Sequence, residues 1–240
     1  MLRALIALIR GLAGRCNDMA LNLSGSSGGD SATGNVTLKG RFNINLGAAL
    51  PTYDVAPAIA YRAELVSDKN RPLMALICDP HLPVRADKIL TLRTLETRML
   101  LKPHDWGVSD WPVEDRRCPI VIVDRPLGSR VMPSLDARMR PMNEDLVARL
   151  LIRPAAEFLE LIANQNLTHR AIRPDNVFYS DAEQTRMVLG DCISSPPAIA
   201  QPTVFETIES GMALPAGRGD GSSTNDLYSL GVTILSLLIG

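Results

Sequence analysis

The stretch Leu167–Phe178 reads Leu-Thr-His-Arg-Ala-Ile-Arg-Pro-Asp-Asn-Val-Phe and follows a segment with helical apolar spacing. It gathers a histidine, two arginines, a proline and an Asp-Asn pair between apolar residues. Further along, Met187–Cys192 has the pattern of a short apolar strand, and Asp191 supplies its only carboxylate. A third stretch, Asn225–Gly240, carries Asp-Leu-Tyr-Ser-Leu-Gly-Val from Asp226 onward and is apolar on nearly every helical face, which is typical of a buried helix. These three stretches, in this order, decide the fold.

The order of these motifs resembles the catalytic core of the protein kinases, whose loop reads H-R-D-L-x-x-x-N ahead of a D-F-G. His169, Arg170 and Asn176 stand at the matching loop positions, and Asp191 stands at the metal-binding aspartate. The segment from Asp226 is similar to the D-x-x-S-L-G-V that opens the central kinase helix. The resemblance implies a two-lobe α+β protein-kinase-like fold. Its small β-rich lobe would carry one helix, and its mainly helical lobe would end at the central buried helix.

The resemblance covers roughly residues 36–240, with a first lobe at 36–124 and a partial second lobe at 125–240. Kinases continue for several more helices, so we expect a truncated domain or a fragment. In the first lobe, alternation and turn residues predict the following elements: a strand at Phe42–Leu46, a hairpin of Ile59–Val66 and Pro72–Cys78 around a turn at Ser67–Asn70, a helix at Asp87–Leu101, and a strand at Pro119–Val123.

In the second lobe, helix start signals are clear. Asn143 is a good N-cap for a helix at Glu144–Leu151, with acids in its first turn. Pro154 suits the first turn of a new helix. Ser223 or Thr224 is expected to cap the last helix from about Asn225.

The loop departs from the kinase pattern at Ala171, where the family keeps its catalytic aspartate. That carboxylate orients the substrate hydroxyl and accepts its proton, which as general-base catalysis contributes roughly 10²–10⁴ in rate. A methyl group can do neither. Arg173 keeps a positive charge near the position of the transferred phosphate. Asn176 and Asp191 keep two oxygen ligands for a hard cation such as Mg²⁺. A tight loop or a strand end would explain each residue alone, but together, within the motif, they favour a metal-binding pair.

The first lobe departs further. A glycine-rich loop should precede the hairpin, yet Asn43–Tyr53 contains only Gly47. Met74–Ile77 matches the V-A-I-K strand with Ile77 at the lysine position, and no lysine lies between Asn70 and Asp87. Glu96 could stand where the family has the lysine's acidic partner, but without a cation it is more simply a surface acid.

The retained residues have architectural roles in the family. His169 would pack under the loop, and Asp226 would tie the last helix to it. Arg170 often pairs with a phosphorylated activation segment. The candidate acceptors here are Ser194, Ser195, Thr203 and Thr207. After Asp191, Cys192-Ile193 replaces Phe-Gly, and a β-branched residue resists the positive φ that glycine allows.

Composition narrows the function classes. A net charge of −1 gives no electrostatic footprint for nucleic acid. The four cysteines lie far apart in sequence, which favours reduced thiols in the cytoplasm and no zinc site. Residues 1–35 form an N-terminal segment and a Gly/Ser-rich linker. Met1–Arg15 has an apolar run too short to span a membrane, so it is either a membrane-surface helix or a short docking helix.

Two functional interpretations remain open. The first is a pseudokinase that serves as a signalling scaffold, binds a protein partner, and binds Mg-ATP weakly or not at all. The second is a divergent Ser/Thr-type kinase that still transfers the γ-phosphate of ATP to protein, with Asp175 or the substrate replacing the missing base. Whether the chain is an enzyme is therefore undecided by sequence, and the sequence identifies neither partner nor substrate.

Overall fold

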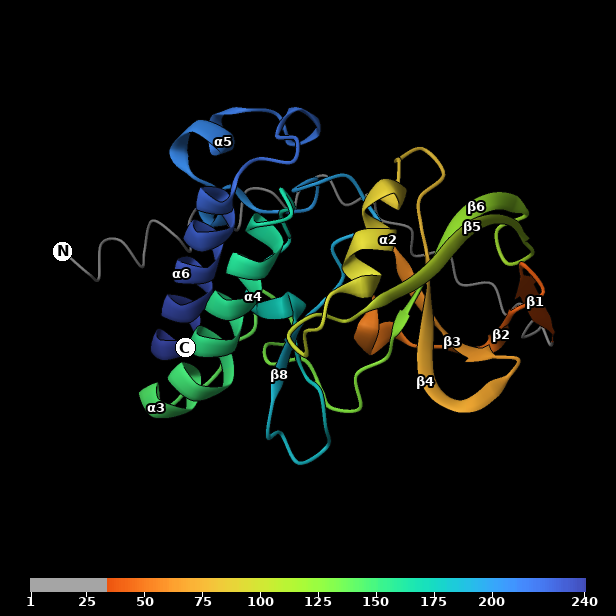
Figure 1. Cartoon of the computed structure of the whole chain (residues 1–240), viewed down its shortest axis with the longest axis horizontal. Coiled ribbons are helices and arrows are strands. Elements are labelled where there is room, and N and C mark those ends of the chain that lie inside the picture. Colours follow the sequence, from red (N-terminus) through yellow and green to blue (C-terminus); the bar gives the residue numbers. More distant parts are fainter. Residues whose placement is uncertain (1–33) are drawn as a thin grey trace.

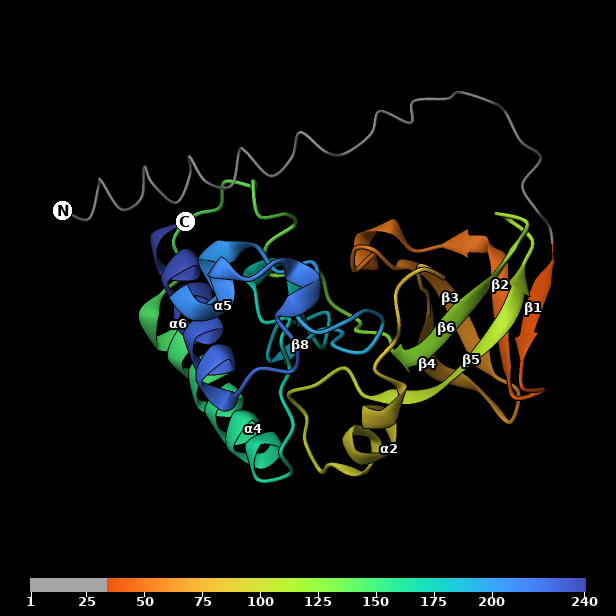
Figure 2. The ribbon, with the colours of Figure 1, turned by 90° about the horizontal axis from the view of Figure 1, so that it is seen from above.

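The computed structural model of the chain describes residues 34–240. The predicted two-lobe α+β arrangement is confirmed: a sheet forms one part and a group of helices the other, with α2 (Ala86–Thr94) near the middle (Figures 1 and 2). Residues 1–33, with the Met1–Arg15 helix prediction, Cys16 and most of the linker, lie outside the described residues. Within residues 34–240, no helix is both long and apolar enough to cross a membrane.

The first lobe is a six-stranded antiparallel sheet with the strand order β1-β2-β3-β4-β6-β5. The sheet curls so far that its two edge strands, β1 and β5, meet. Lys39, which follows β1, forms an ion pair with Asp105 on β5 at 2.7 Å. The strands have the following bounds: β1 Asn35–Leu38, β2 Phe42–Ala49, β3 Ile59–Leu65, β4 Asp68–Ile77, β5 Pro103–Trp111 and β6 Arg116–Asp124. Sequence reasoning did not identify β5.

The second half of strand β4, Leu73–Ile77, is buried on both faces, and the two faces meet different cores. Ala75 and Ile77 point into the curl of the sheet, with Trp111 and Ile120. Leu76 and Cys78 point the other way, into a second core that includes α2 and the helical lobe, which we call the inter-lobe core. Ile77, which the resemblance places at the lysine position, therefore points into the curl of the sheet and not toward the helical lobe, because neighbouring residues of a strand point to opposite faces.

Two boundaries in the first lobe also differ from the predictions. Asp68–Asn70 belongs to β4, so the hairpin turn is shorter than the predicted Ser67–Asn70. Helix α2 ends at Thr94 because Leu95 takes an extended conformation, with ψ at 131°. Glu96 therefore lies beyond the helix and is exposed, and it forms no ion pair within residues 34–240.

The helical lobe begins as predicted at Asn143, whose side-chain oxygen accepts hydrogen bonds from the backbone N–H groups of Asp145 and Leu146. Helix α3 (Glu144–Val147) then continues through a π-helical turn at Ala148–Ile152 into α4 (Arg153–Ala163). Pro154 lies in the first turn of α4, as predicted, although the π-helical turn joins α4 to α3 without a break. A proline lacks the N–H group and crowds the carbonyl of the residue four positions earlier, and a wider turn is one way to accommodate it.

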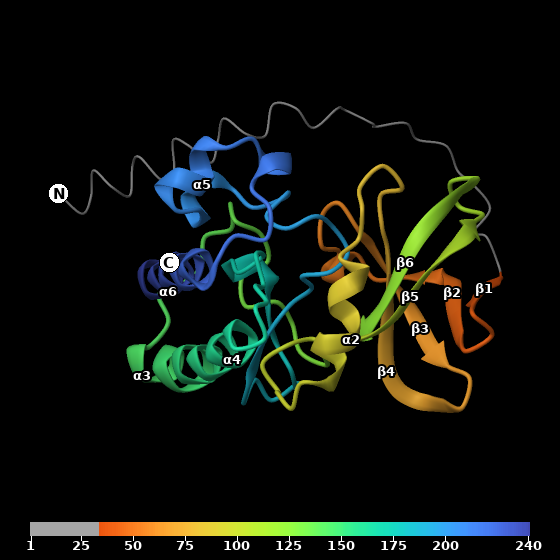
Figure 3. The same ribbon diagram turned by 45° about the horizontal axis from the view of Figure 1, so that its top comes forward.

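The remaining elements surround the loop at Leu167–Phe178. These are β7 (Val177–Tyr179), β8 (Met187–Leu189), α5 (Ile208–Met212) and α6 (Ser223–Ile239), with short 3₁₀ helices at Pro51–Tyr53, Pro174–Asn176, Thr203–Phe205 and Pro215–Gly217. Helix α5 lies beside the N-terminal end of α6 (Figures 1 and 3). The N-cap of α6 is Ser222, one residue before the predicted caps, and its backbone N–H donates to the Asn225 side chain at 2.9 Å.

Helix α6 is buried on one face only. Its buried face includes Leu230, Thr233 and Leu237, whereas Leu227 and Leu235 are 55% and 54% exposed. The prediction of a helix buried all round is therefore wrong for the described residues. Helices α3 and α4 pack against α6 from one side.

Candidate functional site

The loop at Leu167–Phe178 joins α4 to β7 and is fixed by α6. Both oxygens of the buried Asp226 carboxylate accept backbone hydrogen bonds, from the N–H of His169 at 2.7 Å and of Arg170 at 2.8 Å. Burial raises the pKa of Asp226, and these two hydrogen bonds oppose that rise. The structure thus brings Asp226 to the loop, although the two lie far apart in sequence.

His169 is buried beneath the loop, edge-on to the Phe158 ring at 6.3 Å. Its Nδ1 lies 3.3 Å from the N–H of Ala171 and its Nε2 lies 3.2 Å from the carbonyl of Gly190. This pattern suits a neutral ring that accepts at Nδ1 and donates at Nε2. Burial lowers the pKa of His169 to about 3, and the positive charge of Arg85 adds to the effect.

Arg170 forms a buried ion pair with Glu206, and the two side chains are both 0% exposed. Its guanidinium lies 2.9 Å from the Glu206 carboxylate and 3.1 Å from the Ser210 hydroxyl. A carboxylate therefore meets this arginine where the resemblance suggests a phosphate. Of the predicted acceptors, Ser194 is buried and donates to Asp191, and Thr207 caps α5.

Ala171 and Asp175 lie in the loop at Leu167–Phe178, which we call the catalytic loop after the kinase motif that it resembles. The Asp175 carboxylate accepts a hydrogen bond from Arg173 Nε at 2.8 Å. Arg173 also donates to the carbonyl of Ala200 at 3.3 Å, so it connects the loop to the segment that follows Asp191. The carboxylate that could replace the missing base is thus already paired with an arginine.

Asn176 and Asp191 lie side by side, but their polar atoms are largely used within the chain. Asn176 Nδ2 donates to the carbonyls of Ala171 at 2.8 Å and Asp191 at 2.9 Å. The Asp191 carboxylate accepts three hydrogen bonds, from the backbone N–H of Ile193 and from the N–H and hydroxyl of Ser194. Burial raises the pKa of Asp191, and these hydrogen bonds oppose the rise.

The Asn176 amide oxygen is the one atom here that favours a cation. It is buried and has no hydrogen-bond partner among the described residues. However, it packs against Gly190 so closely that an added Cβ there would lie 2.0 Å away. The Asp191 carboxylate accepts hydrogen bonds from the residues that follow it. Asn176 and Asp191 therefore do not present free oxygen atoms in the octahedral arrangement that Mg²⁺ prefers.

The loop from Leu50 to Ala58 joins β2 to β3, and we call it the cleft loop; it overlaps only the end of Asn43–Tyr53, where a glycine-rich loop was expected and where most residues belong to β2. The cleft loop contains no glycine. The Tyr53 ring stacks on Phe178 of β7, with centroids 5.9 Å apart and planes 21° apart. The Tyr53 hydroxyl donates to the carbonyl of Gly128, 3.3 Å away. The cleft loop therefore places an aromatic ring between the two lobes.

Arg130 holds the cleft loop in this position. It donates to the carbonyl of Thr52 at 2.7 Å and also to the carbonyls of Asp54 and Asp175. Its guanidinium lies over the Phe178 ring, 5.0 Å from the centroid, in cation–π geometry. Cleft loop, β7 and catalytic loop are thus joined through a single side chain.

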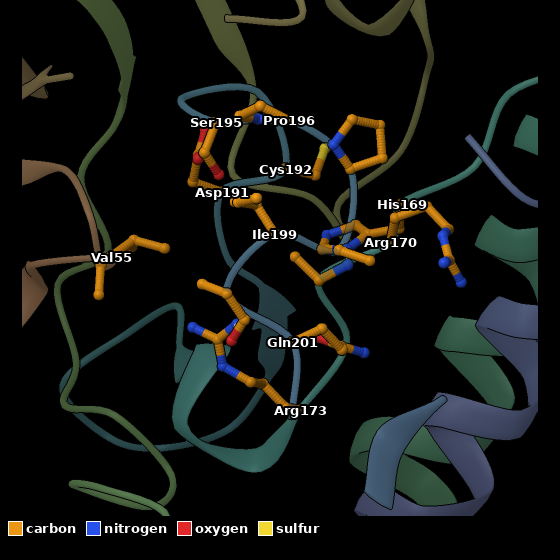
Figure 4. A pocket seen from close by; sticks show the side chains of 15 residues that line it. Val55, His169, Arg170, Arg173, Asp191, Cys192, Ser195, Pro196, Ile199 and Gln201 are labelled. Carbon is orange, nitrogen blue, oxygen red and sulfur yellow. The ribbon is translucent and has the colours of Figure 1, made fainter. Parts of the chain in front are cut away.

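The space left between the cleft loop and the catalytic loop is small. Figure 4 shows Val55 on one side of this cavity, with Asp191, Ser195 and Arg173 around the rest of it. The cavity measures about 20 Å³. That is enough for about one water molecule, whereas sites for small ligands usually measure roughly 300–1,000 Å³.

The buried half of β4, Leu73–Ile77, carries no cation. Cys78, which follows β4, lies in the inter-lobe core, and burial raises the pKa of its thiol, with a further contribution from the negative charge of Asp191. Cys78 thus lies close enough to Asp191 for the charge of that carboxylate to contribute to the raised pKa of its thiol. A neutral thiol cannot bind phosphate as the lysine of a kinase does.

Arg85 is, with Tyr53 and Arg130, a residue of the site that the sequence analysis did not identify. It stands at the N-cap of α2, is 5% exposed, and donates to the carbonyls of His169 and Cys192 at 3.0 Å and of Thr168 at 2.9 Å. It also contacts Asp220 at 3.2 Å. One guanidinium thus joins α2 to the catalytic loop and to the segment after β8. No motif marks it, because its partners lie far along the chain.

Comparisons with known proteins agree with this architecture. No protein-family model and no curated protein sequence matches the chain. Among solved structures, it is similar to Rad53 1–466 in complex with AMP-PNP, with a TM-score of 0.61 and 16% identity over 82% of this chain and 48% of that one. The chain thus spans about half the length of that structure.

It is also similar to the kinase domain of PknI from Mycobacterium tuberculosis, with a TM-score of 0.61 and 21% identity over 86% of this chain and 77% of that one. A double mutant of that domain gives a TM-score of 0.62 at 17% identity, over 86% and 78% of the two chains. These likenesses show the fold. The chain adopts a two-lobe α+β protein-kinase-like fold.

Proposed function

We propose that this domain is a pseudokinase that acts by binding a partner protein rather than by transferring phosphate. The observation that carries the proposal is the cleft loop, which places Tyr53 on Phe178 and leaves a cavity of about 20 Å³ beside Ala171. The dispersed cysteines favour a cytoplasmic location for this scaffold.

The side chains that phosphoryl transfer requires are either absent or already engaged in hydrogen bonds within the chain. A kinase needs a base for the substrate hydroxyl, a lysine on the phosphates and metal ions that neutralise charge. Ala171 has no proton acceptor, and Cys78 provides no positive charge. Were Mg²⁺ bound, Asn176 and Asp191 would hold it and it would supply charge neutralisation, but their hydrogen bonds to the chain do not favour that arrangement.

Nucleotide binding is weak at most under this proposal. To admit ATP, Tyr53 would have to leave Phe178, and Arg130 would lose its contacts with Thr52 and Asp54. The apparent affinity falls by the fraction of molecules in the open state. Opening that costs about 3 kcal/mol would weaken binding by a factor on the order of 100.

The competing function is a divergent active kinase, favoured by the buried Asn176 amide oxygen that has no partner in the described residues. It requires either Asp175 or the substrate itself to replace the missing base. Asp175 accepts a hydrogen bond from Arg173 at 2.8 Å, and this ion pair would have to break before the carboxylate could receive a proton from a substrate.

The test is a thermal-shift titration with Mg-ATP on the parent protein, on Tyr53→Ala and on Asp191→Ala. A ligand at 100 times its Kd stabilises the folded state by about 2.7 kcal/mol. We expect no shift for the parent at millimolar nucleotide and a measurable shift for Tyr53→Ala, since removal of the ring opens the cleft. Tyr228→Ala is the matched control, because Tyr228 lies on α6 and is 42% exposed.

Phosphate transfer is measured in parallel with radiolabelled ATP and a general protein substrate. No transfer is expected from the parent. Incorporation of phosphate by the parent, lost in Asp191→Ala, would establish the active-kinase function instead. Activity that arises only in Ala171→Asp would support loss of the base as the decisive change.

A further inference from the structure

A second cavity lies on the first lobe, away from the catalytic loop. It is an open groove of about 220 Å³ between the β3–β4 hairpin and the connector that follows β6. We call it the hairpin groove. Its basic lining residues are Arg62, Lys69, Arg71 and Arg125, and Glu64 is the only acidic one. The whole chain has a net charge of −1, so this is a local surplus of positive charge.

Among the residues that the structure describes, two of the four cations have no acidic partner. Arg62 pairs with Glu64 at 3.3 Å, and Arg71 pairs with Asp124 at 3.5 Å. Lys69 and the Arg125 side chain form no ion pair or hydrogen bond within residues 34–240, and Arg125 Nε is buried without a partner there. A buried donor without an acceptor is costly, and a bound carboxylate would satisfy it.

The backbone beside the groove is also unpaired. Strand β6 pairs with β4 only as far as Leu73 opposite Asp124, followed by one hydrogen bond from Arg125 N–H to the Pro72 carbonyl. Residues Asp68–Arg71 continue β4 beyond that point and are exposed. They present an edge of extended backbone to which another strand can add.

Size and rim contacts indicate the kind of occupant. At about 220 Å³ the groove is smaller than the roughly 300–1,000 Å³ of most sites for small molecules and cofactors. It suits one or two side chains of a longer ligand. Leu127, 57% exposed, adds an apolar contact at the rim. An extended peptide with carboxylates and an apolar residue matches the charge, the backbone edge and Leu127 together.

We infer that the hairpin groove is the docking site for an acidic, extended segment of a partner protein, which pairs with Asp68–Arg71 and places carboxylates against Lys69 and Arg125. The inference rests on the proposed function, because it names the surface and the partner chemistry through which the pseudokinase would act.

The experiment is fluorescence anisotropy with the labelled peptide Thr-Glu-Asp-Leu-Glu-Asp-Val-Thr and its Gln/Asn counterpart. The acidic peptide should bind saturably, and raising NaCl from about 50 to about 200 mM should weaken it severalfold. Lys69→Glu should weaken binding about fivefold, and Lys69→Glu with Arg125→Glu more than about tenfold. Arg117→Glu is the control, an exposed cation at the other end of β6, and should change the Kd less than about twofold.

Lys69 is fully on the surface, so Lys69→Glu tests the groove even if the double variant does not fold. Equal affinity of parent and Lys69→Glu for the acidic peptide would overturn the inference, and so would equal binding of the Gln/Asn peptide. The phosphate-transfer assay separates the two claims. If the parent transfers phosphate and its peptide binding depends on Lys69, the proposed function is wrong but the hairpin groove remains a docking site. If the parent transfers no phosphate and its peptide binding does not depend on Lys69, only the docking site is contradicted.

Discussion

His169 is a buried residue whose protonation the fold opposes, and this makes stability depend on pH. Its folded pKa is about 3, below the ordinary value of 6.5. As the pH falls below 6.5, His169 becomes protonated in the unfolded chain but stays neutral in the folded chain. The contribution of His169 is thus complete above pH 6.5 and is lost progressively toward pH 3, with a slope approaching 1.4 kcal/mol per pH unit.

We expect the parent to lose about 2 kcal/mol of unfolding free energy through His169 between about pH 7.5 and about pH 5. His169→Asn should be less stable at neutral pH but should show a shallower slope in this window. Urea denaturation at each pH measures both. The raised pKa values of Asp191 and Asp226 act with the opposite sign and are common to both proteins. Parallel curves for parent and variant would contradict the buried, neutral assignment.

Single residues of the catalytic loop were predictable where a motif fixes their spacing, as for His169, Asn176 and Asp191. Tyr53 and Arg130 were not, because they act through contacts between segments far apart in sequence. Arg130 binds carbonyls of Thr52 and Asp175, and a carbonyl acceptor leaves no sequence signal. The occupied cleft could therefore be found only from the structure.

Helix α2 depends on Arg85 for its attachment to the catalytic loop. Arg85→Leu leaves the carbonyls of Thr168, His169 and Cys192 without that donor, so we expect a loss of about 2–4 kcal/mol in unfolding free energy. Arg93→Leu on the same helix is the control, since Arg93 makes one exposed hydrogen bond to His104, and its loss should stay below about 1 kcal/mol.

Hydrogen exchange gives a second readout for Arg85. In Arg85→Leu the amides of α2 should exchange faster at low denaturant than those of β6, because the helix loses its anchor while the sheet keeps its own pairing. Equal losses of stability for Arg85→Leu and Arg93→Leu would show that Arg85 is not an anchor.

Elements were predicted well where local chemistry decides them, as at the Asn143 N-cap, and poorly where tertiary packing decides them. The second half of β4, Leu73–Ile77, is apolar on both faces, so it offers no alternation that could fix which residue faces the helical lobe. The face on which Ile77 lies could therefore not be predicted. Helix α2 stops at Thr94 although apolar spacing continues to Leu101, because Leu95, Met99 and Leu101 enter the inter-lobe core in irregular conformation instead.

The whole molecule is organised around the inter-lobe core, which contains residues from both lobes. Leu76 and Val123 enter it from the sheet, and Leu151, Phe158 and Leu189 from the helical part. The order of motifs in the sequence predicted the two lobes. It could not predict that they share one core, since that depends on how α2 and the cleft loop pack between them.

A shared core predicts that the two lobes unfold together. Leu151 is 0% exposed in the helical lobe, so Leu151→Ala should cost about 2–5 kcal/mol. The chain has two tryptophans, Trp106 and Trp111, and both lie on β5 of the other lobe. Tryptophan fluorescence therefore reports the sheet, while circular dichroism at 222 nm reports mainly the helices. Both signals should shift to the same lower urea midpoint in Leu151→Ala.

Ile120→Ala, in the core inside the curled sheet, is the reciprocal variant and should also move both signals. If the fluorescence midpoint stays unchanged in Leu151→Ala while the dichroism midpoint falls, the lobes unfold independently, and the inter-lobe core does not couple them.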